Sequence, residues 1–251
     1  MSTRAPALRI EIVRTAALSP TQWDELWQLT DTFYDTDRDY AQARLQQHQR
    51  TVMVRSRAGG ELLGTASINV HHVEFQGRVV TAIHTSHVLL QPEVRGRNLV
   101  QKIGLRMFLA ERLRHPLRPI WWFFDTFSYK SYLLLPRNFR AYWPRFDRAT
   151  PPSERALMHQ LAAGIYGPDW RPSQGIVASS GRKRLRAGVA PLEPGPADSP
   201  DLAFISRANP GHANGDMLVC LCPLSASNWL SVGLRAARRL LRPAKARPAT
   251  A

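Results

Sequence analysis

The sequence has few acidic residues for its many basic ones. Its 251 residues include 19 Asp and Glu against 34 Lys and Arg, which leaves a formal net charge of +15 at pH 7. Such a charge attracts nucleic acid, an anionic membrane face, a phosphate-rich cofactor or an acidic carrier protein. The arginines are spread along the chain, so a compositional bias from a GC-rich coding sequence explains the charge equally well.

Cysteines and long apolar runs are also scarce. Cys220 and Cys222 are separated by one residue, so in a strand they point to opposite faces, which disfavours a disulfide between them. No apolar run approaches the ~18 residues of a transmembrane helix, and residues 1–6 lack the apolar core of a signal peptide. We therefore predict a reduced, cytoplasmic location, with peripheral contact at the inner face of the membrane left open.

The pattern of apolar residues predicts an α/β fold. Alternation and turn signals predict strands over 8–13, 51–55, 62–70, 78–90 and 119–126. Caps and helical spacing predict helices that begin at Ser19 and Ser128 and others over 36–48, 98–114 and 151–166. This order predicts a mixed, mostly antiparallel sheet with helices on both faces, because a meander of strands is followed by a β-α-β crossover.

The composition changes near residue 170, which predicts a domain over 1–170 and a C-terminal extension over 171–251. Within the extension we expect a Pro- and Arg-rich loop over 181–200 and short strands over 175–178, 202–206 and 217–222. Residues 228–242 predict a basic amphipathic helix. Its pattern fits an interfacial membrane anchor, and it fits equally a terminal helix docked on the domain.

The segment Pro92-Glu93-Val94-Arg95-Gly96-Arg97-Asn98 joins the strand over 78–90 to the helix over 98–114. A helix N-terminus offers free backbone N–H groups and partial positive charge, which together bind anions. Gly96 lets the backbone approach a phosphate closely, and Arg95 and Arg97 attract it. An apolar strand end, a proline and an arginine before such a helix resemble the cofactor motif of the GNAT acyltransferases.

The resemblance covers residues 8–145 and implies a GNAT-like fold that binds an acyl thioester of CoA or of an acyl carrier protein. In this sequence Asn98 and Val100 stand where the family has small residues, and Val100 narrows the space beside a pyrophosphate. A carrier protein, which is typically acidic, presents only one phosphate. The resemblance places the donor against Val88, Leu90, Val94, Arg95, Gly96, Arg97, Asn98, Leu99 and Val100.

The resemblance also suggests catalytic residues. His84 lies six residues before Leu90, where histone-acetylating relatives have a glutamate base, and it shares a strand face with Ser86, Val88 and Leu90. Histidine suits removal of a proton from an amine near neutral pH. His87 is the alternative base, because a bulge would change its facing. Tyr132, or else Tyr129, stands where the family has a tyrosine acid, although each of these His and Tyr side chains fits a packing role too.

These observations predict an N- or O-acyltransferase acting on an amine or hydroxyl acceptor. The alternative is a basic protein that binds nucleic acid or an anionic membrane without catalysis, on a degenerate GNAT fold. Nucleic acid is the weaker choice of the two, because no helix-turn-helix, zinc finger, RNP or KH signature occurs. We expect no metal cofactor, because His71-His72 has no cysteine or carboxylate at ligand spacing.

Overall fold

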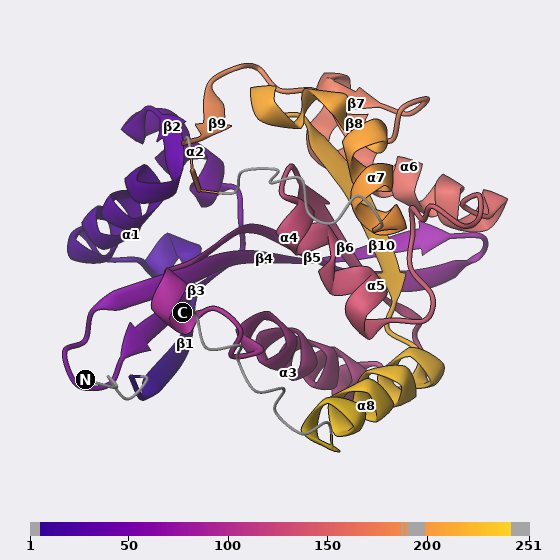
Figure 1. The fold of residues 1–251 in the computed structure, drawn as a ribbon, viewed down its shortest axis with the longest axis horizontal. Helices are drawn as coiled ribbons and strands as arrows, with labels where there is room; N and C mark the ends of the chain where they lie inside the picture. Colours follow the sequence, from indigo (N-terminus) through magenta and orange to yellow (C-terminus); the bar gives the residue numbers. More distant parts are fainter. Residues whose placement is uncertain (1–5, 187, 190–198, 242–251) are drawn as a thin grey trace, which may run out of the picture.

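A computed structural model of the chain describes residues 6–186, 188–189 and 199–241. Among these residues, eight strands form one sheet in the order β1-β3-β4-β5-β6-β10-β8-β7 (Figure 1). Their bounds are Leu8–Arg14 (β1), Arg50–Ser56 (β3), Leu62–Phe75 (β4), Arg78–Leu90 (β5), Ile120–Thr126 (β6), Trp170–Arg171 (β7), Ile176–Val177 (β8) and Met217–Pro223 (β10). A separate pair joins β2 (Tyr34–Thr36) to β9 (Lys183–Leu185).

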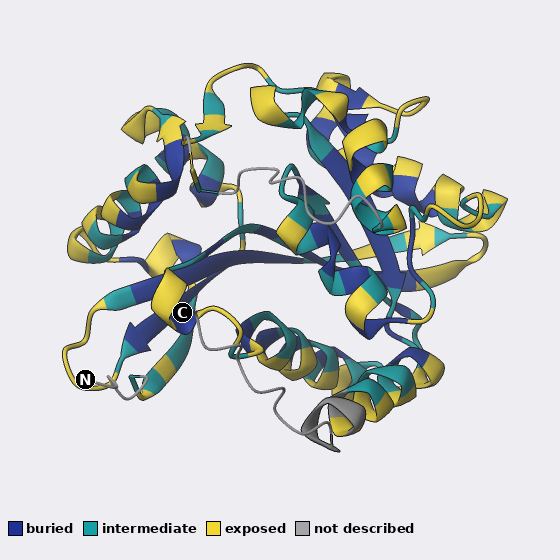
Figure 2. Ribbon diagram, in the orientation of Figure 1, coloured by how far each residue is buried: buried dark blue, intermediate teal, exposed yellow. Residues whose placement is uncertain are grey.

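Helices cover both faces of the sheet. Alternate residues of a strand point to opposite faces, and in β6 Phe124 packs in the core beneath α3 while Phe123 packs in the core beneath α6. Figure 2 shows the result as buried central strands under helices whose outer surfaces are exposed. The helices are α1 (Pro20–Phe33), α2 (Arg38–Gln46), α3 (Leu99–Arg114), α4 (Tyr129–Tyr132), α5 (Leu134–Asn138), α6 (Pro152–Tyr166), α7 (Pro200–Ala208) and α8 (Ala226–Leu241).

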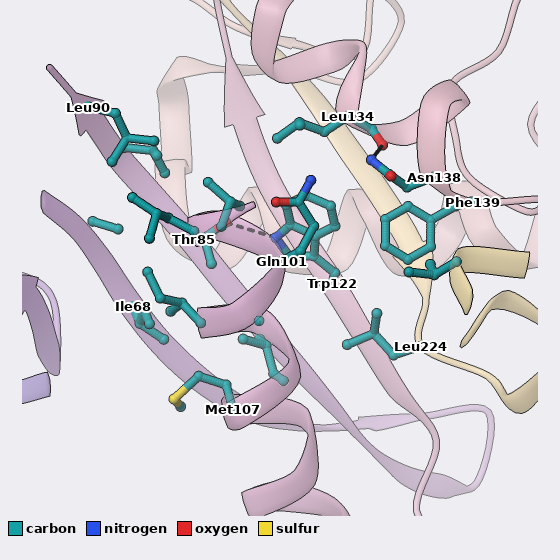
Figure 3. A pocket seen from close by; sticks show the side chains of 18 of the residues that line it. Ile68, Thr85, Leu90, Gln101, Met107, Trp122, Leu134, Asn138, Phe139 and Leu224 are labelled. Carbon is teal, nitrogen blue, oxygen red and sulfur yellow. Dashed lines mark hydrogen bonds between the residues drawn. The ribbon is translucent and has the colours of Figure 1, made fainter. Parts of the chain in front are cut away.

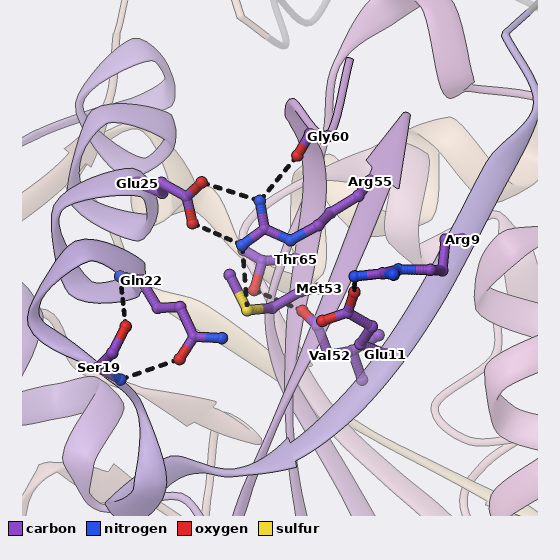
Figure 4. A network of polar contacts seen from close by, with 10 residues as sticks. All are labelled: Arg9, Glu11, Ser19, Gln22, Glu25, Val52, Met53, Arg55, Gly60 and Thr65. Carbon is purple, nitrogen blue, oxygen red and sulfur yellow. Dashed lines mark hydrogen bonds and ion pairs between the residues drawn. The ribbon is translucent and has the colours of Figure 1, made fainter. Parts of the chain in front are cut away.

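The first helix is fixed to the sheet by an ion pair. Ser19 and Gln22 form a capping box at the start of α1. Arg55 on β3 donates to both carboxylate oxygens of Glu25 on α1, at 2.8 and 2.5 Å, and also to the carbonyl of Gly60 (Figure 4). This bidentate geometry holds α1 against the edge of the sheet that carries β3.

The strands β5 and β6 part near the middle of the sheet. Their parallel pairing runs from Thr81 opposite Ile120 to Thr85 opposite Phe124 and ends there. Beyond that point β6 continues to pair with β10, and β5 continues to pair with β4. A bulge in β5 accompanies the parting, because the register with β4 shifts and His87 adopts a φ of 49°. The gap between the two strand ends is the feature that positions the candidate site.

The C-terminal part of the chain completes the same sheet. β10 pairs with β6 along its whole length, and β8 pairs with β10, so the residues after 170 do not form a sheet of their own. The strand predicted over 202–206 is wrong: Pro200 and Asp201 open the helix α7 there. The loop predicted over 181–200 contains β9, and residues 187 and 190–198 of it lie outside the described residues.

Helix α8 is docked on the domain through the first half of its length. Trp229 and Val232 pack against the core beneath α3, and the rings of Trp229 and Phe108 lie 5.0 Å apart. Asn228 is buried and accepts from the backbone N–H groups of Arg140 and Ala141. Residue 242 of the predicted tail lies outside the described residues. Among the residues that the structure describes, no helix combines the length and apolar character needed to cross a bilayer.

Candidate functional site

A cleft of about 810 Å³ opens where β5 and β6 part. It reaches the backbone and side chains between the end of β5 and the start of α3. The nine residues that sequence reasoning assigned to donor binding all line this cleft: Val88, Leu90, Val94, Arg95, Gly96, Arg97, Asn98, Leu99 and Val100. The structure therefore gathers them on one surface, and their role in binding a donor stays a prediction.

The loop before α3 has the backbone that an anion site needs. Pro92–Val94 form a single 3-10 turn, and the Val94 side chain is fully buried beneath it. Gly96 and Asn98 then adopt φ values of 74° and 55°, in the left-handed region that glycine and asparagine tolerate best. Because the Asn98 side chain makes no cap hydrogen bond, it leaves the first N–H groups of α3 facing the cleft region.

Basic side chains surround the cleft. Arg44, Lys130 and Lys183 line it together with Arg95 and Arg97. The Nε of Arg95 donates to the carbonyl of Leu90 at 2.9 Å, which fixes that guanidinium at the end of β5. This distribution places positive charge beside the N-terminus of α3, where it favours phosphate.

A buried hydrogen-bonded group lies at the point of parting. The Nε2 atom of His84 is 3.0 Å from Oδ1 of Asp125, and the hydroxyl of Tyr166 lies 2.5 Å from the same carboxylate oxygen. The side chains of His84 and Asp125 are only 1% and 5% exposed. His84 comes from β5, Asp125 from β6 and Tyr166 from the end of α6, so three elements that are distant in sequence meet here.

The environment of Asp125 keeps it ionised. Burial alone would raise the pKa of Asp125, but hydrogen bonds from His84 and Tyr166 and the nearby charges of His84 and Lys183 outweigh it and lower the pKa. Burial, reinforced by Asp125, raises the pKa of Tyr166 far above its ordinary value, so this tyrosine remains a donor. A carboxylate that accepts from Nε2 of His84 leaves Nδ1 with its lone pair, and Nδ1 has no hydrogen-bond partner among the described residues.

A polar cavity of about 180 Å³ lies beside this group on the face of the sheet covered by α2 and α6. His48, Asn69 and His71 line it with His84, and Ser86 and Arg44 line both this cavity and the cleft. Burial, followed by the charge of His84, lowers the pKa values of His48 and His71 to about 4. The His48 and His71 imidazoles in the wall of the cavity are therefore neutral at neutral pH.

His87 and Tyr132 occupy different surroundings. The bulge turns His87 so that its Nδ1 lies 3.0 Å from the Ser86 hydroxyl in the wall of the cleft, and burial holds its pKa well below the ordinary value. Tyr132 is fully buried, and its hydroxyl donates to the carbonyl of Pro144. It lines neither the cleft nor the polar cavity, so we give Tyr132 a packing role instead of the acid role suggested by the resemblance.

Lys183 is a further group in the cleft. It lies on β9, with its Nζ 4.0 Å from the centre of the Tyr34 ring. Burial lowers its pKa to about 7, although the charge of Asp125 opposes the effect. Its ammonium group therefore gives up its proton near neutral pH, beside the parting strands.

Three potential metal ligands meet elsewhere, at the far end of α3. His72, Glu111 and His115 bring one nitrogen or oxygen atom each within 4.8 Å of one another. Two arginines already engage this group: Arg114 pairs with Glu111 at 2.9 Å, and Arg118 lies 3.1 Å from Nδ1 of His72. With an arginine N–H on Nδ1, the neutral imidazole of His72 carries its proton on Nε2, which lies 3.9 Å from Glu111.

Sequence reasoning missed several residues that the fold brings to the site. Asp125 was visible only as a polar residue at the end of an apolar strand, and Tyr166 lies 41 residues farther along the chain. Lys183 comes from a stretch that composition indicates as a loop. Helical spacing identified the helix over 36–48 but gave no signal that its end, at His48, faces β5.

Neither a family model nor a curated protein matches this sequence. Solved structures of acyl- and acetyltransferases match part of it. A conserved protein of unknown function from Enterococcus faecalis V583, described as a probable N-acyltransferase, is 16% identical, with 51% of this chain and 31% of that chain covered and a TM-score of 0.38. An acetyltransferase from Trypanosoma brucei is 22% identical; the match covers 58% of this chain and 100% of that chain, with a TM-score of 0.36. An aminoglycoside N-acetyltransferase in complex with CoA is 13% identical; the match covers 46% of this chain and 76% of that chain, with a TM-score of 0.32.

The chain thus spans about a third of the Enterococcus protein. Its own strand order, with β5 and β6 parallel and parting before α3, is the mixed, mostly antiparallel architecture expected from the sequence. The expectation of an α/β fold with a mixed, mostly antiparallel sheet and helices on both faces is confirmed.

Proposed function

We propose that the protein is an acyltransferase that moves an acyl group from a thioester of CoA, or of an acyl carrier protein, to an amine or hydroxyl acceptor. The observation that carries this proposal is the His84–Asp125–Tyr166 group at the parting of β5 and β6, between the basic cleft and the polar cavity. The cleft would take the donor and the cavity the acceptor. Holding both in one place supplies much of the rate of such a reaction.

His84 is the general base in this proposal. Its Nδ1 accepts a proton from the acceptor, directly or through one water, as the acceptor nitrogen or oxygen attacks the thioester carbonyl. Asp125 orients the imidazole and stabilises its cationic form, and Tyr166 fixes Asp125. The carbon–sulfur bond then breaks, and the thiolate takes a proton. Lys183, with its pKa lowered to about 7, is the group in the cleft best suited to supply that proton.

The distribution of charge favours a phosphate-bearing donor over a nucleic acid as the acidic partner. Several arginines outside the cleft are already paired, such as Arg55 with Glu25 and Arg186 with Asp31. Arg95 and Arg97, which line the cleft, instead lie in the loop that leads into α3. A phosphopantetheine arm entering there would meet backbone N–H groups and positive charge together.

The test is to incubate the protein with acyl-CoA and acyl-carrier-protein donors and a set of amines and alcohols, and to identify acylated products by mass spectrometry. We expect His84→Ala to lower turnover by about 10²–10⁴ with little change in donor affinity. Asp125→Asn keeps the shape and should lower turnover by a smaller factor. Full turnover by His84→Ala would remove His84 from the mechanism. Donor binding without any product would favour the non-catalytic alternative.

A further inference from the structure

A second, apolar cavity lies under α3, and the proposed reaction does not yet use it. Its volume is about 60 Å³, and aliphatic or aromatic side chains form most of its wall (Figure 3). The sheet supplies Ile68 and Ile83, α3 supplies Ile103 and Met107, and α8 supplies Trp229. A dry space of this kind accepts apolar groups in preference to water.

The cavity adjoins the donor cleft. Nine residues line both spaces: Thr85, Val88, Leu90, Leu99, Val100, Gln101, Trp122, Leu134 and Asn138. Two of these shared residues are joined by a hydrogen bond, because the indole N–H of Trp122 donates to Thr85 Oγ1 at 2.8 Å (Figure 3). That bond satisfies the indole N–H, and five of the nine shared residues are aliphatic, so a chain that passes between the two spaces would meet a mostly apolar surface.

The two faces of β5 divide the site. His84 and Ser86 face the polar cavity, and Thr85 between them faces the apolar cavity, because alternate residues of a strand point to opposite faces. A thioester held in the gap beside Thr85 would therefore have the base on one side of the sheet and the apolar cavity on the other. The acceptor and the acyl chain need not compete for space.

We propose that the cavity under α3 binds the hydrocarbon chain of the donor, so that the preferred donors are thioesters of medium or long acyl chains and not acetyl thioesters. This inference rests on the proposed acyl transfer. A narrow, apolar cavity selects a flexible alkyl chain over a polar or charged acyl group. Each methylene that enters it should tighten binding about fourfold, the equivalent of about 0.8 kcal/mol.

Gly104 on α3 provides a way to fill the cavity. It lines the wall, and a Cβ atom added there would meet no atom within 4 Å. Gly104→Phe should therefore place its ring in the cavity with little disturbance. Leu105→Phe is the matched control, because Leu105 is the next residue of the same helix and is 40% exposed. Val232→Phe fills the cavity from α8, on the opposite wall, and serves if Gly104→Phe does not fold.

The measurement is the affinity for CoA and for its acetyl, hexanoyl, octanoyl and dodecanoyl thioesters by calorimetry, which needs no turnover. For the wild-type protein we expect the affinity to rise at least tenfold from the acetyl to the octanoyl thioester. In Gly104→Phe this rise should disappear, whereas Leu105→Phe should show the same rise as wild type. CoA itself should bind all three proteins equally. Affinity that is flat with chain length, or a rise that survives both filling variants, overturns the chain site while leaving the donor cleft intact. If CoA and every ester fail to bind, the same acyl series is presented on an acyl carrier protein, and failure of those thioesters as well would overturn the proposed function and this inference together.

Discussion

At the scale of single residues, the site combines one ionised carboxylate with several histidines that burial keeps neutral. His48, His71 and His87 all have pKa values below the ordinary 6.5, in each case because burial penalises the charged imidazole first. The pKa of Asp125 is also lowered, but for a carboxyl group this favours the charged form, which its hydrogen bonds stabilise. The site therefore holds a single negative charge among neutral rings, which suits a base that becomes positively charged during the reaction.

These shifts predict how stability depends on pH. Between about pH 4 and 6.5 the unfolded chain binds protons on His48, His71 and His87 that the folded protein does not, so the free energy of unfolding falls as the pH falls. We expect on the order of 1 kcal/mol for each histidine, or about 2–4 °C in Tm. Thermal unfolding followed by circular dichroism at pH 4.5, 5.5, 6.5 and 8 measures the effect.

The double variant His48→Gln/His71→Gln provides the control. Glutamine does not titrate, so the variant should lose less stability than wild type between pH 6.5 and 4.5, whatever the substitutions cost at pH 8. An equal loss in both proteins would show that other groups dominate the acid response.

At the scale of elements, the loop from Pro92 to Asn98 should control donor binding. Gly96 has a φ of 74°, and a side chain there would extend toward the space in which we place the phosphate. Gly96→Trp should lower affinity for CoA at least tenfold, measured by calorimetry. Gly77→Trp is the matched control, because Gly77 also has a φ of 74° and open space around it but lies in the turn between β4 and β5.

The two glycine variants carry the same backbone strain, on the order of 1–3 kcal/mol. A loss of CoA binding in both would point to general damage. A loss in neither would remove the loop from the donor site.

Local pattern predicted most elements, and it was wrong where tertiary pairing decides. The strand over 78–90 and the helix over 98–114 are close to β5 and α3, since β-branched residues and an apolar stripe act locally. Residues 202–206 are apolar enough for a strand, but Pro200 starts a helix and Asn209 ends it. The strand predicted over 217–222 is confirmed as β10, but its pairing with β6 depends on tertiary structure that the local pattern does not show.

In the candidate site too, the sequence predicted what depends on local pattern and missed what depends on tertiary packing. Period two correctly placed Ser86 on the face of His84, but it was wrong for Val88 and Leu90, because the bulge at His87 turns them to the other face, where they line the apolar cavity. Tyr166 could not be predicted, because its contact with Asp125 depends on how α6 packs across the sheet. The bulge that turns His87 was foreseen only as an alternative, since a bulge depends on the register with β4.

At the scale of the whole molecule, helix α8 leaves part of its apolar surface uncovered. Trp229 and Val232 are packed against the domain, while Leu230 and Leu234 are 64% and 53% exposed. These two leucines are four residues apart, so they lie on the same face of α8, and the protein that carries them is strongly basic. They remain candidates for contact with an anionic membrane, which the sequence pattern of residues 228–242 suggested.

We expect the protein to sediment with vesicles of anionic lipid at low salt and to be released as salt screens the charge. Leu230→Ser/Leu234→Ser should reduce the bound fraction severalfold, and vesicles of neutral lipid should bind neither protein. Point changes are preferable to truncation at residue 226, because removing Asn228 would leave buried backbone groups near Ala141 without partners. Equal binding of both proteins to anionic vesicles would exclude the leucine pair as the anchor.

The position of β10 has a consequence for how the protein is made. β6 lies in the middle of the sheet, yet one of its neighbours is β5 and the other comes from residues 217–223, almost a hundred positions later. While the chain emerges from a ribosome, one edge of β6 therefore stays unpaired until residues 217–223 have been synthesised. An aromatic strand with an open edge is a template for pairing with other chains. A nascent chain that stalls before residue 223 should accordingly aggregate or recruit chaperones, while one that stalls after α8 should not.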